Sequence, residues 1–109
     1  MAWRVETLNA QVDAELAALP DDMRAKLVRI GQLIVEFGLP RLREPYVKHV
    51  TGKLWEMRVS GRAGIARAIY VAARGERVVI LHAFAKKTQT APTRAIQTAI
   101  RRAKEADLI

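Results

Sequence analysis

Three segments decide the fold of this chain: LWEMRV at residues 54–59, IARAIY at 65–70 and LHAFAKKT at 81–88. Apolar and polar side chains alternate in them with a period of about two, which indicates β-strands rather than helices. Short turns rich in Gly and Arg separate the segments. Connections of hairpin length join neighbouring antiparallel strands, so the chain predicts a three-stranded meander. The predicted strands span 54–59, 65–72 and 78–84.

The two faces of the first predicted strand differ in character. One face, which we expect to pack on helices with its Trp in the core, carries Trp55, Met57 and Val59. The other face points outward or into a groove and carries Leu54, Glu56 and Arg58. On the second strand Arg67 shares a face with Ile69 and Val71, so we expect a bulge or partial burial there.

Helical periodicity flanks the meander on both sides. Residues 2–8 suit a short edge strand, and Asn9 can cap a first helix. Asp21 can cap a second helix that Gly38 ends, after which two prolines make residues 39–45 a connecting segment. The apolar stripe of this second helix consists of Met23, Leu27, Ile30, Ile34 and Phe37. Pro92 can open a last helix whose outer face is expected to carry Arg94, Arg101, Arg102 and Lys104.

This order of elements predicts an α+β fold in one domain, residues 1–109. Its small antiparallel meander has three strands, or four with the N-terminal segment, and packs against N-terminal helices and a C-terminal helix. We expect the helices on one side of the sheet, which leaves Glu56 and Arg58 on an uncovered face. A chain of 109 residues has no room for a second core.

Composition excludes several functions. The chain has no cysteine, which rules out disulfides, thiolate nucleophiles and Cys-based zinc sites. The N-terminus lacks a signal sequence and no apolar run approaches the roughly 20 residues of a membrane span, so we expect a cytoplasmic protein. The net charge is +8, with four Arg/Lys against six Asp/Glu in residues 1–40 and fifteen against five in residues 41–109. Such an asymmetry favours a polyanionic partner, although a solvated basic face would look the same.

The basic residues suit one reaction in particular. Attack of an RNA 2′-hydroxyl on the adjacent phosphate needs no metal if cations stabilise the phosphate and other groups move two protons. Arginine binds phosphate oxygens with a fixed charge, whereas lysine among other cations can exchange protons. Four cations that lie on or just beyond the three strands could converge on one surface: Arg58, Arg67, Lys86 and Lys87. Lysines at a sheet edge can also serve only to prevent aggregation.

Taken together, these motifs resemble those of the HigB-like, phage Gp49-like branch of the RelE/ParE toxins of type II toxin–antitoxin systems. The resemblance covers roughly residues 45–104 and rests on LWEMR at 54–58, RAIY at 67–70, LHAFAKKT at 81–88 and Pro92, in the family's order and spacing. It implies a RelE-like fold and a ribosome-dependent mRNA endoribonuclease, an mRNA interferase that inhibits translation without a cofactor.

The resemblance also implies roles for single residues. Arg58 and Arg67 match the strand cations that hold and stabilise the phosphate, and Lys86, with Lys87 beside it, matches the basic residue after the last strand. Related toxins often carry a tyrosine or histidine near the C-terminal end, but none follows Lys87 here, which leaves the general base and acid open. Lys86 or Lys87 is our preferred proton-handling residue. The expected RNA- or ribosome-binding residues are Lys48, Lys53, Arg62, Arg94, Arg101 and Arg102.

Three further residues are candidates for support or proton transfer. Glu56 could act as a base, but neighbouring cations favour its ionised form, so a salt bridge that positions Arg58 or Arg67 is the alternative role. His82 titrates in a useful range, yet it stands among apolar residues and could be a core histidine bonded to a backbone group. Tyr70 could stack on a base or pack in the core.

The implied partners are the ribosome with its mRNA and a cognate HigA-like helix-turn-helix antitoxin, through whose complex operator DNA would be bound. Two other functions stay open. A ParE-like toxin of the same fold would inhibit DNA gyrase through protein contacts, and a basic nucleic-acid-binding domain would bind RNA or DNA without cleaving it. A metal-dependent nuclease fits worst, because the basic region holds too few carboxylates for two cations.

Overall fold

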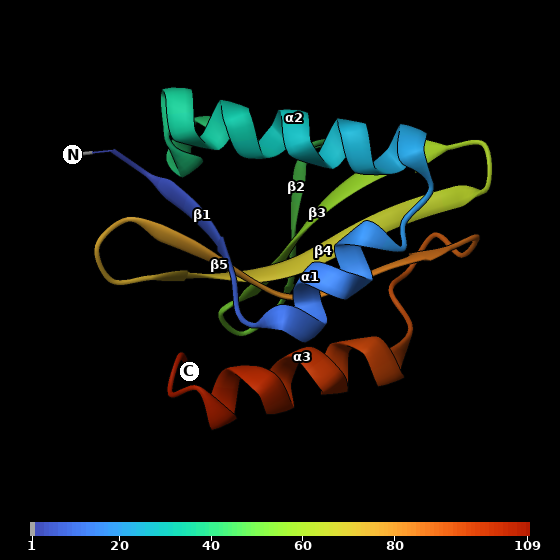
Figure 1. The fold of residues 1–109 in the computed structure, drawn as a ribbon. Coiled ribbons are helices and arrows are strands. Elements are labelled where there is room, and N and C mark those ends of the chain that lie inside the picture. The colour runs from blue at the N-terminus through green and yellow to red at the C-terminus, as the bar shows by residue number, and fades with distance from the viewer. Residues whose placement is uncertain (1) are drawn as a thin grey trace.

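The computed structural model, which describes residues 2–109, is a five-stranded sheet with helices on both faces (Figure 1). The strands are β1 (Arg4–Thr7), β2 (Val47–Thr51), β3 (Leu54–Gly61), β4 (Gly64–Ala73) and β5 (Arg77–Lys86). The helices are α1 (Ala10–Ala17), α2 (Asp21–Phe37) and α3 (Thr93–Glu105), with a 3₁₀ turn at Leu39–Arg41. The α+β class is therefore confirmed.

The sheet is larger than predicted. Its strand order is β1-β5-β4-β3-β2, and β2 to β5 form an antiparallel meander. β1 pairs with β5 in parallel, with Val5 opposite Val78, so the sheet is mixed. The meander also includes β2, which the sequence analysis missed. The N-terminal strand was expected at an edge and is found there.

Helices cover both faces of the sheet, which corrects the expectation of helices on one side only. On the first face, α1 and α2 pack in a core cluster that includes Val12, Leu27 and Met57. On the second face, α3 packs against a cluster that includes Leu54 and Leu81 (Figure 1). The second cluster uses Ala99 and Ala103, whose small side chains let α3 approach the sheet closely.

Two apolar residues were placed wrongly in the core. Four of the five predicted residues of the α2 stripe are buried, but Phe37, at the last position of the helix, is 55% exposed. Trp55 is 41% exposed, and its ring forms an edge-on contact with the His49 ring, with the two centroids 5.1 Å apart. It lies on the predicted face of β3, where β2 and the 3₁₀ segment border it rather than a helix.

One of the two predicted N-caps is found. The Asn9 side chain accepts a hydrogen bond from the backbone N–H of Val12 at 3.0 Å, as predicted. The prediction that Asp21 caps α2 is wrong, because Pro20 is the N-cap, no side chain caps this helix, and Asp21 is its first residue. The next residue, Asp22, accepts a hydrogen bond from the Arg62 backbone at 3.1 Å. This bond fixes the start of α2 to the β3–β4 turn. Gly61 permits the contact, because a Cβ there would lie 2.6 Å from the Asp22 carboxylate.

A polar network joins α1, β5 and α3 where β1 no longer covers the edge of β5. The Glu15 carboxylate accepts hydrogen bonds from the Ala83 backbone N–H at 3.1 Å, the His82 ring at 2.9 Å and the Arg102 guanidinium at 2.8 and 3.0 Å. Arg102 also donates to the Leu81 carbonyl at 2.9 Å. Burial raises the pKa of Glu15, but these hydrogen bonds lower it more, so its pKa lies below the usual value.

This network corrects two predictions. Arg102 is buried, not displayed on the outer face of the last helix, and so does not form part of an RNA-binding surface. His82 is bonded to a carboxylate rather than to a backbone group. None of the described helices is long and apolar enough to cross a membrane.

Glu15→Gln tests the network. The folded-state pKa of Glu15 is depressed, so the ionised carboxylate stabilises the fold at neutral pH, and this contribution is lost as pH falls below about 4.5. We expect the variant to unfold with about 1–3 kcal/mol less free energy at pH 7, and the difference from wild type to shrink between pH 5 and 3. Urea unfolding at each pH measures this. Glu105→Gln, in an exposed pair with Arg101, is the matched control and should show almost no difference. A Glu15→Gln difference that stays constant with pH would contradict the assignment.

Candidate functional site

Strand register brings the predicted cations to one end of the sheet. Arg58 on β3 lies directly opposite Arg67 on β4, Arg67 lies opposite Phe84 on β5, and Lys86 ends β5 opposite Ile65. All of these come from the face that α3 covers only in part. The apolar residues of that face sit at its other end, under α3. The register therefore puts Arg58 and Arg67 side by side and Lys86 toward the same end of the sheet.

Arg67 occupies the centre of this group and is fully buried. Its Nε donates to a Glu56 carboxylate oxygen at 3.1 Å, and its Nη2 donates to the Thr88 carbonyl at 2.8 Å. Burial lowers the pKa of Arg67, and the Arg58 charge lowers it further, whereas Glu56 raises it. A guanidinium keeps its proton despite such a lowered pKa, because its ordinary pKa lies far above neutral pH. Arg67 is thus a buried cation with a partner carboxylate.

One atom of this guanidinium has no partner. Nη1 of Arg67 is buried and makes no hydrogen bond within residues 2–109. An unpaired buried donor costs about 1–3 kcal/mol, which makes such groups rare outside functional or strained sites. The expected contact of Arg67 with a phosphate does not occur in this conformation, because the side chain is covered. In this structure Arg67 binds the Glu56 carboxylate and the Thr88 carbonyl.

The other three predicted cations, Arg58, Lys86 and Lys87, reach the surface. Arg58 is half-buried and points its Nη2 toward the Gln89 carbonyl at 3.4 Å, so two arginines contact the segment that follows β5. Lys86 and Lys87 are exposed. Gly64 is required beside them, since its φ is +132° and a Cβ there would lie 2.7 Å from the Lys86 carbonyl.

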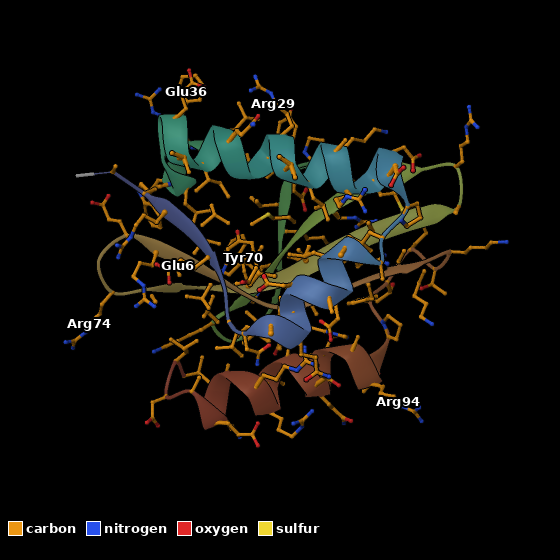
Figure 2. All side chains as sticks on the ribbon, in the orientation of Figure 1. Glu6, Arg29, Glu36, Tyr70, Arg74 and Arg94 are labelled. Atoms are coloured by element: carbon orange, nitrogen blue, oxygen red, sulfur yellow. The ribbon has the colours of Figure 1, made fainter. Side chains whose placement is uncertain are left out.

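The three supporting candidates separate in the structure. Glu56 is buried and paired with Arg67, which confirms the positioning salt bridge. Tyr70 lies inside the α2-side core, where burial raises its pKa well above the usual value, and is too covered to stack on a base (Figure 2). His82 belongs to the network of Glu15 and Arg102. Within residues 2–109 it makes no hydrogen bond to the predicted catalytic cations Arg58, Arg67, Lys86 and Lys87.

The remaining predicted basic residues lie on several surfaces rather than one. Lys48 is on β2, Lys53 and Arg62 are in hairpin turns, and Arg94 and Arg101 are on α3. All five are exposed. Arg94 projects from α3 away from the sheet (Figure 2).

An open groove of about 810 Å³ lies between α2 and the β2–β3 edge of the sheet. It is lined by Lys26, Arg29, Ile30, Leu33, Glu44, Pro45, Tyr46, Lys48, Arg58, Val59 and Ser60. The sequence analysis named neither the α2 cations of this groove nor Tyr46. A signal was present for the strand beside them, because Val47 and Val50 with Thr51 supply β-branched residues before a Gly-containing turn.

Glu56→Ala should be strongly destabilising, because it leaves the Arg67 charge buried without a counterion. Breaking a buried pair in this way costs about 3–5 kcal/mol. Urea unfolding at pH 7 is the measurement, with Glu105→Ala in the exposed Arg101 pair as the matched control. The double variant Glu56→Leu/Arg67→Met removes both charges and should regain most of the stability. A small effect of Glu56→Ala would show that Arg67 is not buried in solution.

The comparisons with known proteins agree with this architecture. Residues 14–104 match the family model described as phage-derived protein Gp49-like. No curated protein sequence matches the chain. Among solved structures, a mutant of the Escherichia coli toxin RelE in the free state is similar with a TM-score of 0.63 and 16% identity, over 94% of this chain and 98% of that one.

A second solved structure, the archaeal RelE–RelB complex from Pyrococcus horikoshii, gives a TM-score of 0.54 and 24% identity. The match covers 83% of this chain and 100% of the other. At these identities the two structures show a shared fold. The family match spans most of the chain and includes both central strands and the lysines after β5. The chain belongs to the phage-derived Gp49-like protein family and has the RelE fold.

Proposed function

We propose that this protein is the toxin of a type II toxin–antitoxin pair and acts as a metal-independent endoribonuclease that cuts mRNA on the ribosome. The observation that carries the proposal is the group of Arg58, Lys86 and Lys87 around the buried Glu56–Arg67 pair, on the central strands of a RelE-like sheet. The family match supports it, because the matched residues include this whole group.

Arg58 is the phosphate-binding residue in this mechanism. Its guanidinium is partly exposed, donates to the Gln89 carbonyl at 3.4 Å and pairs with no carboxylate within residues 2–109. A fixed fork of N–H donors stabilises the charge that grows on the phosphate as the 2′-oxygen attacks. Arg67 is a positioning residue: it ties Glu56 in β3 to the chain at Thr88 and so sets where Arg58 and the lysines stand.

The reaction needs two proton transfers. One lysine of the Lys86–Lys87 pair accepts the proton of the 2′-hydroxyl as the new oxygen–phosphorus bond forms. The other donates a proton to the 5′-oxygen as its bond to phosphorus breaks, which gives a 2′,3′-cyclic phosphate and a free 5′-hydroxyl. The proposed mechanism gives Tyr70 and His82 no role, because Tyr70 is buried in the core and His82 is bonded to Glu15.

An antitoxin is the proposed regulatory partner. The Pyrococcus horikoshii relative was solved as a complex of RelE with RelB, which supports a protein partner for this chain too. We expect a HigA-like helix-turn-helix protein, encoded nearby, that covers the basic surface and carries the complex to operator DNA. Its contact surface should be acidic, because the toxin's net charge is +8.

Primer extension on ribosomes programmed with a defined mRNA tests the activity. Wild-type protein should create new 3′ ends in the ribosomal A site, and these should be absent when ribosomes are omitted. Arg58→Ala should lower the cleavage rate by about 100-fold or more, the usual loss when one preorganised electrostatic donor is removed. Arg74→Ala, on the distant β4–β5 turn, is the matched control and should cut at the wild-type rate (Figure 2).

The double variant Glu56→Leu/Arg67→Met separates folding from function. It should fold and yet cleave poorly, since the chain at Thr88 loses its anchor. Full activity in this variant would show that the buried pair is only structural. Uncut mRNA with a wild-type protein that still stops growth would contradict the nuclease and favour gyrase as the target.

A further inference from the structure

The groove between α2 and the β2–β3 edge has the chemistry of a site for an unpaired nucleotide. Its volume of about 810 Å³ is in the range of small-molecule pockets, and it is open along one side. Apolar side chains of Ile30, Leu33 and Val59 form part of its lining. Such a lining suits the flat face of a base, while the polar rim suits its phosphates.

The rim is cationic and largely uncompensated. Lys26 and Arg29 stand on α2, and Lys48 and Arg58 stand across from them on β2 and β3. Within residues 2–109, none of these four cations forms an ion pair, although the chain pairs six of its other arginines with carboxylates. Glu44 is the single acidic residue in the lining. Unpaired cations on two walls of a groove attract a polyanion that lies between them.

An exposed aromatic ring completes the site. Tyr46 is 47% exposed and lines the groove, and its backbone is held on both sides. Its N–H donates to the Arg43 carbonyl at 2.9 Å, and its carbonyl accepts from the Arg58 N–H at 3.2 Å. The ring therefore stands on a fixed backbone at the entry to β2. Exposed aromatic rings beside cations are the usual platform for a base of a single strand.

Arg58 connects this groove to the proposed cleavage surface. Its backbone N–H donates a hydrogen bond to the Tyr46 carbonyl, and its side chain lines the groove. The same side chain donates to the carbonyl of Gln89, the residue after the one that Arg67 binds. A single strand whose phosphate sits at Arg58 can thus continue around the β2–β3 edge of the sheet into the groove. Arg58 belongs both to the groove and to the group that it forms with Lys86 and Lys87, so the two regions form one path.

We propose that this groove binds a nucleotide of single-stranded RNA next to the cleaved bond, with its base stacked on Tyr46 and its phosphates held by Lys26, Arg29 and Lys48. The choice of RNA strand rests on the proposed function; the binding itself does not. Base stacking makes the site tolerant of sequence and selective for unpaired strands, because a base inside a duplex has no free face.

Binding of a short fluorescent single-stranded RNA to the purified protein, without ribosomes, tests the groove directly. Tyr46→Leu removes the ring from an exposed position and should weaken binding about tenfold, whereas Tyr46→Phe keeps the ring and should bind like wild type. Arg29→Ala and Lys48→Ala should each reduce the slope of log affinity against log salt by about 0.7. Arg29 is exposed on α2, so its loss should not disturb packing (Figure 2).

The control variant is Arg74→Ala, which removes the same charge far from the groove (Figure 2). It should bind the single strand with nearly wild-type affinity. Equal binding of Tyr46→Leu and Tyr46→Phe, or salt slopes unchanged by Arg29→Ala and Lys48→Ala, would overturn the proposal. So would equal affinity for duplex and single-stranded RNA. These results are independent of cleavage, so failure of the nuclease and failure of the groove can be told apart.

A photocrosslinking residue in place of Tyr46 identifies the strand on programmed ribosomes. p-Benzoylphenylalanine at this position should crosslink to the mRNA beside the A-site codon. A crosslink to an unpaired ribosomal RNA nucleotide in place of the mRNA would show that the groove does not hold the cleaved strand. Crosslinks to ribosomal protein alone would overturn the proposal.

Discussion

The ion pair between Glu56 and Arg67 is the interaction on which the site depends. It joins β3 to β4, because the Nε of Arg67 lies 3.1 Å from a Glu56 carboxylate oxygen. The same guanidinium binds the chain after β5 through the Thr88 carbonyl. A pair so buried is an expensive way to join strands, because desolvation of both charges offsets most of their attraction. Apolar residues of the same size would serve stability as well or better. Its place among surface cations therefore indicates a positioning role more than a contribution to the free energy of folding.

The division of one sheet face explains how a small protein has both a core and a site. Toward one end of this face, residues such as Leu54, Val71 and Val79 pack beneath the alanines of α3. Toward the other end, Arg58 and Arg67 replace the apolar residues, and the chain from Lys87 to Ala91 passes beside them before α3 begins. The helix thus closes only the apolar part. Arg102 takes part in this closure, since it holds α3 to β5 and to α1 through Glu15.

The sequence predicted the positions of the helices and strands better than their burial and strand pairing. Period-two alternation located β3, β4 and β5, and Asn9, Gly38 and Pro92 marked helix ends, because these signals are local. Burial depends on contacts from distant segments. Arg102 was placed on the outer face of α3, although it lies three residues after Ala99 and so shares its buried stripe. The parallel pairing of β1 with β5 joins residues more than seventy positions apart, and no local pattern encodes it.

The same limit applies to the site. Strand parity brought Arg58 and Arg67 together correctly, but it could not show that Arg67 is covered while Arg58 stays at the surface. That difference arises from the segment after β5, whose carbonyls accept from both arginines. The proposed mechanism therefore gives the two residues different tasks, since only a surface guanidinium can contact a phosphate. The cations left unpaired at the surface lie on both sides of Arg58, toward Lys86 in one direction and toward Tyr46 in the other. Among residues 2–109, Arg77, Arg102 and Arg67 pair with carboxylates whereas these cations do not, which is the arrangement that the proposed RNA path requires.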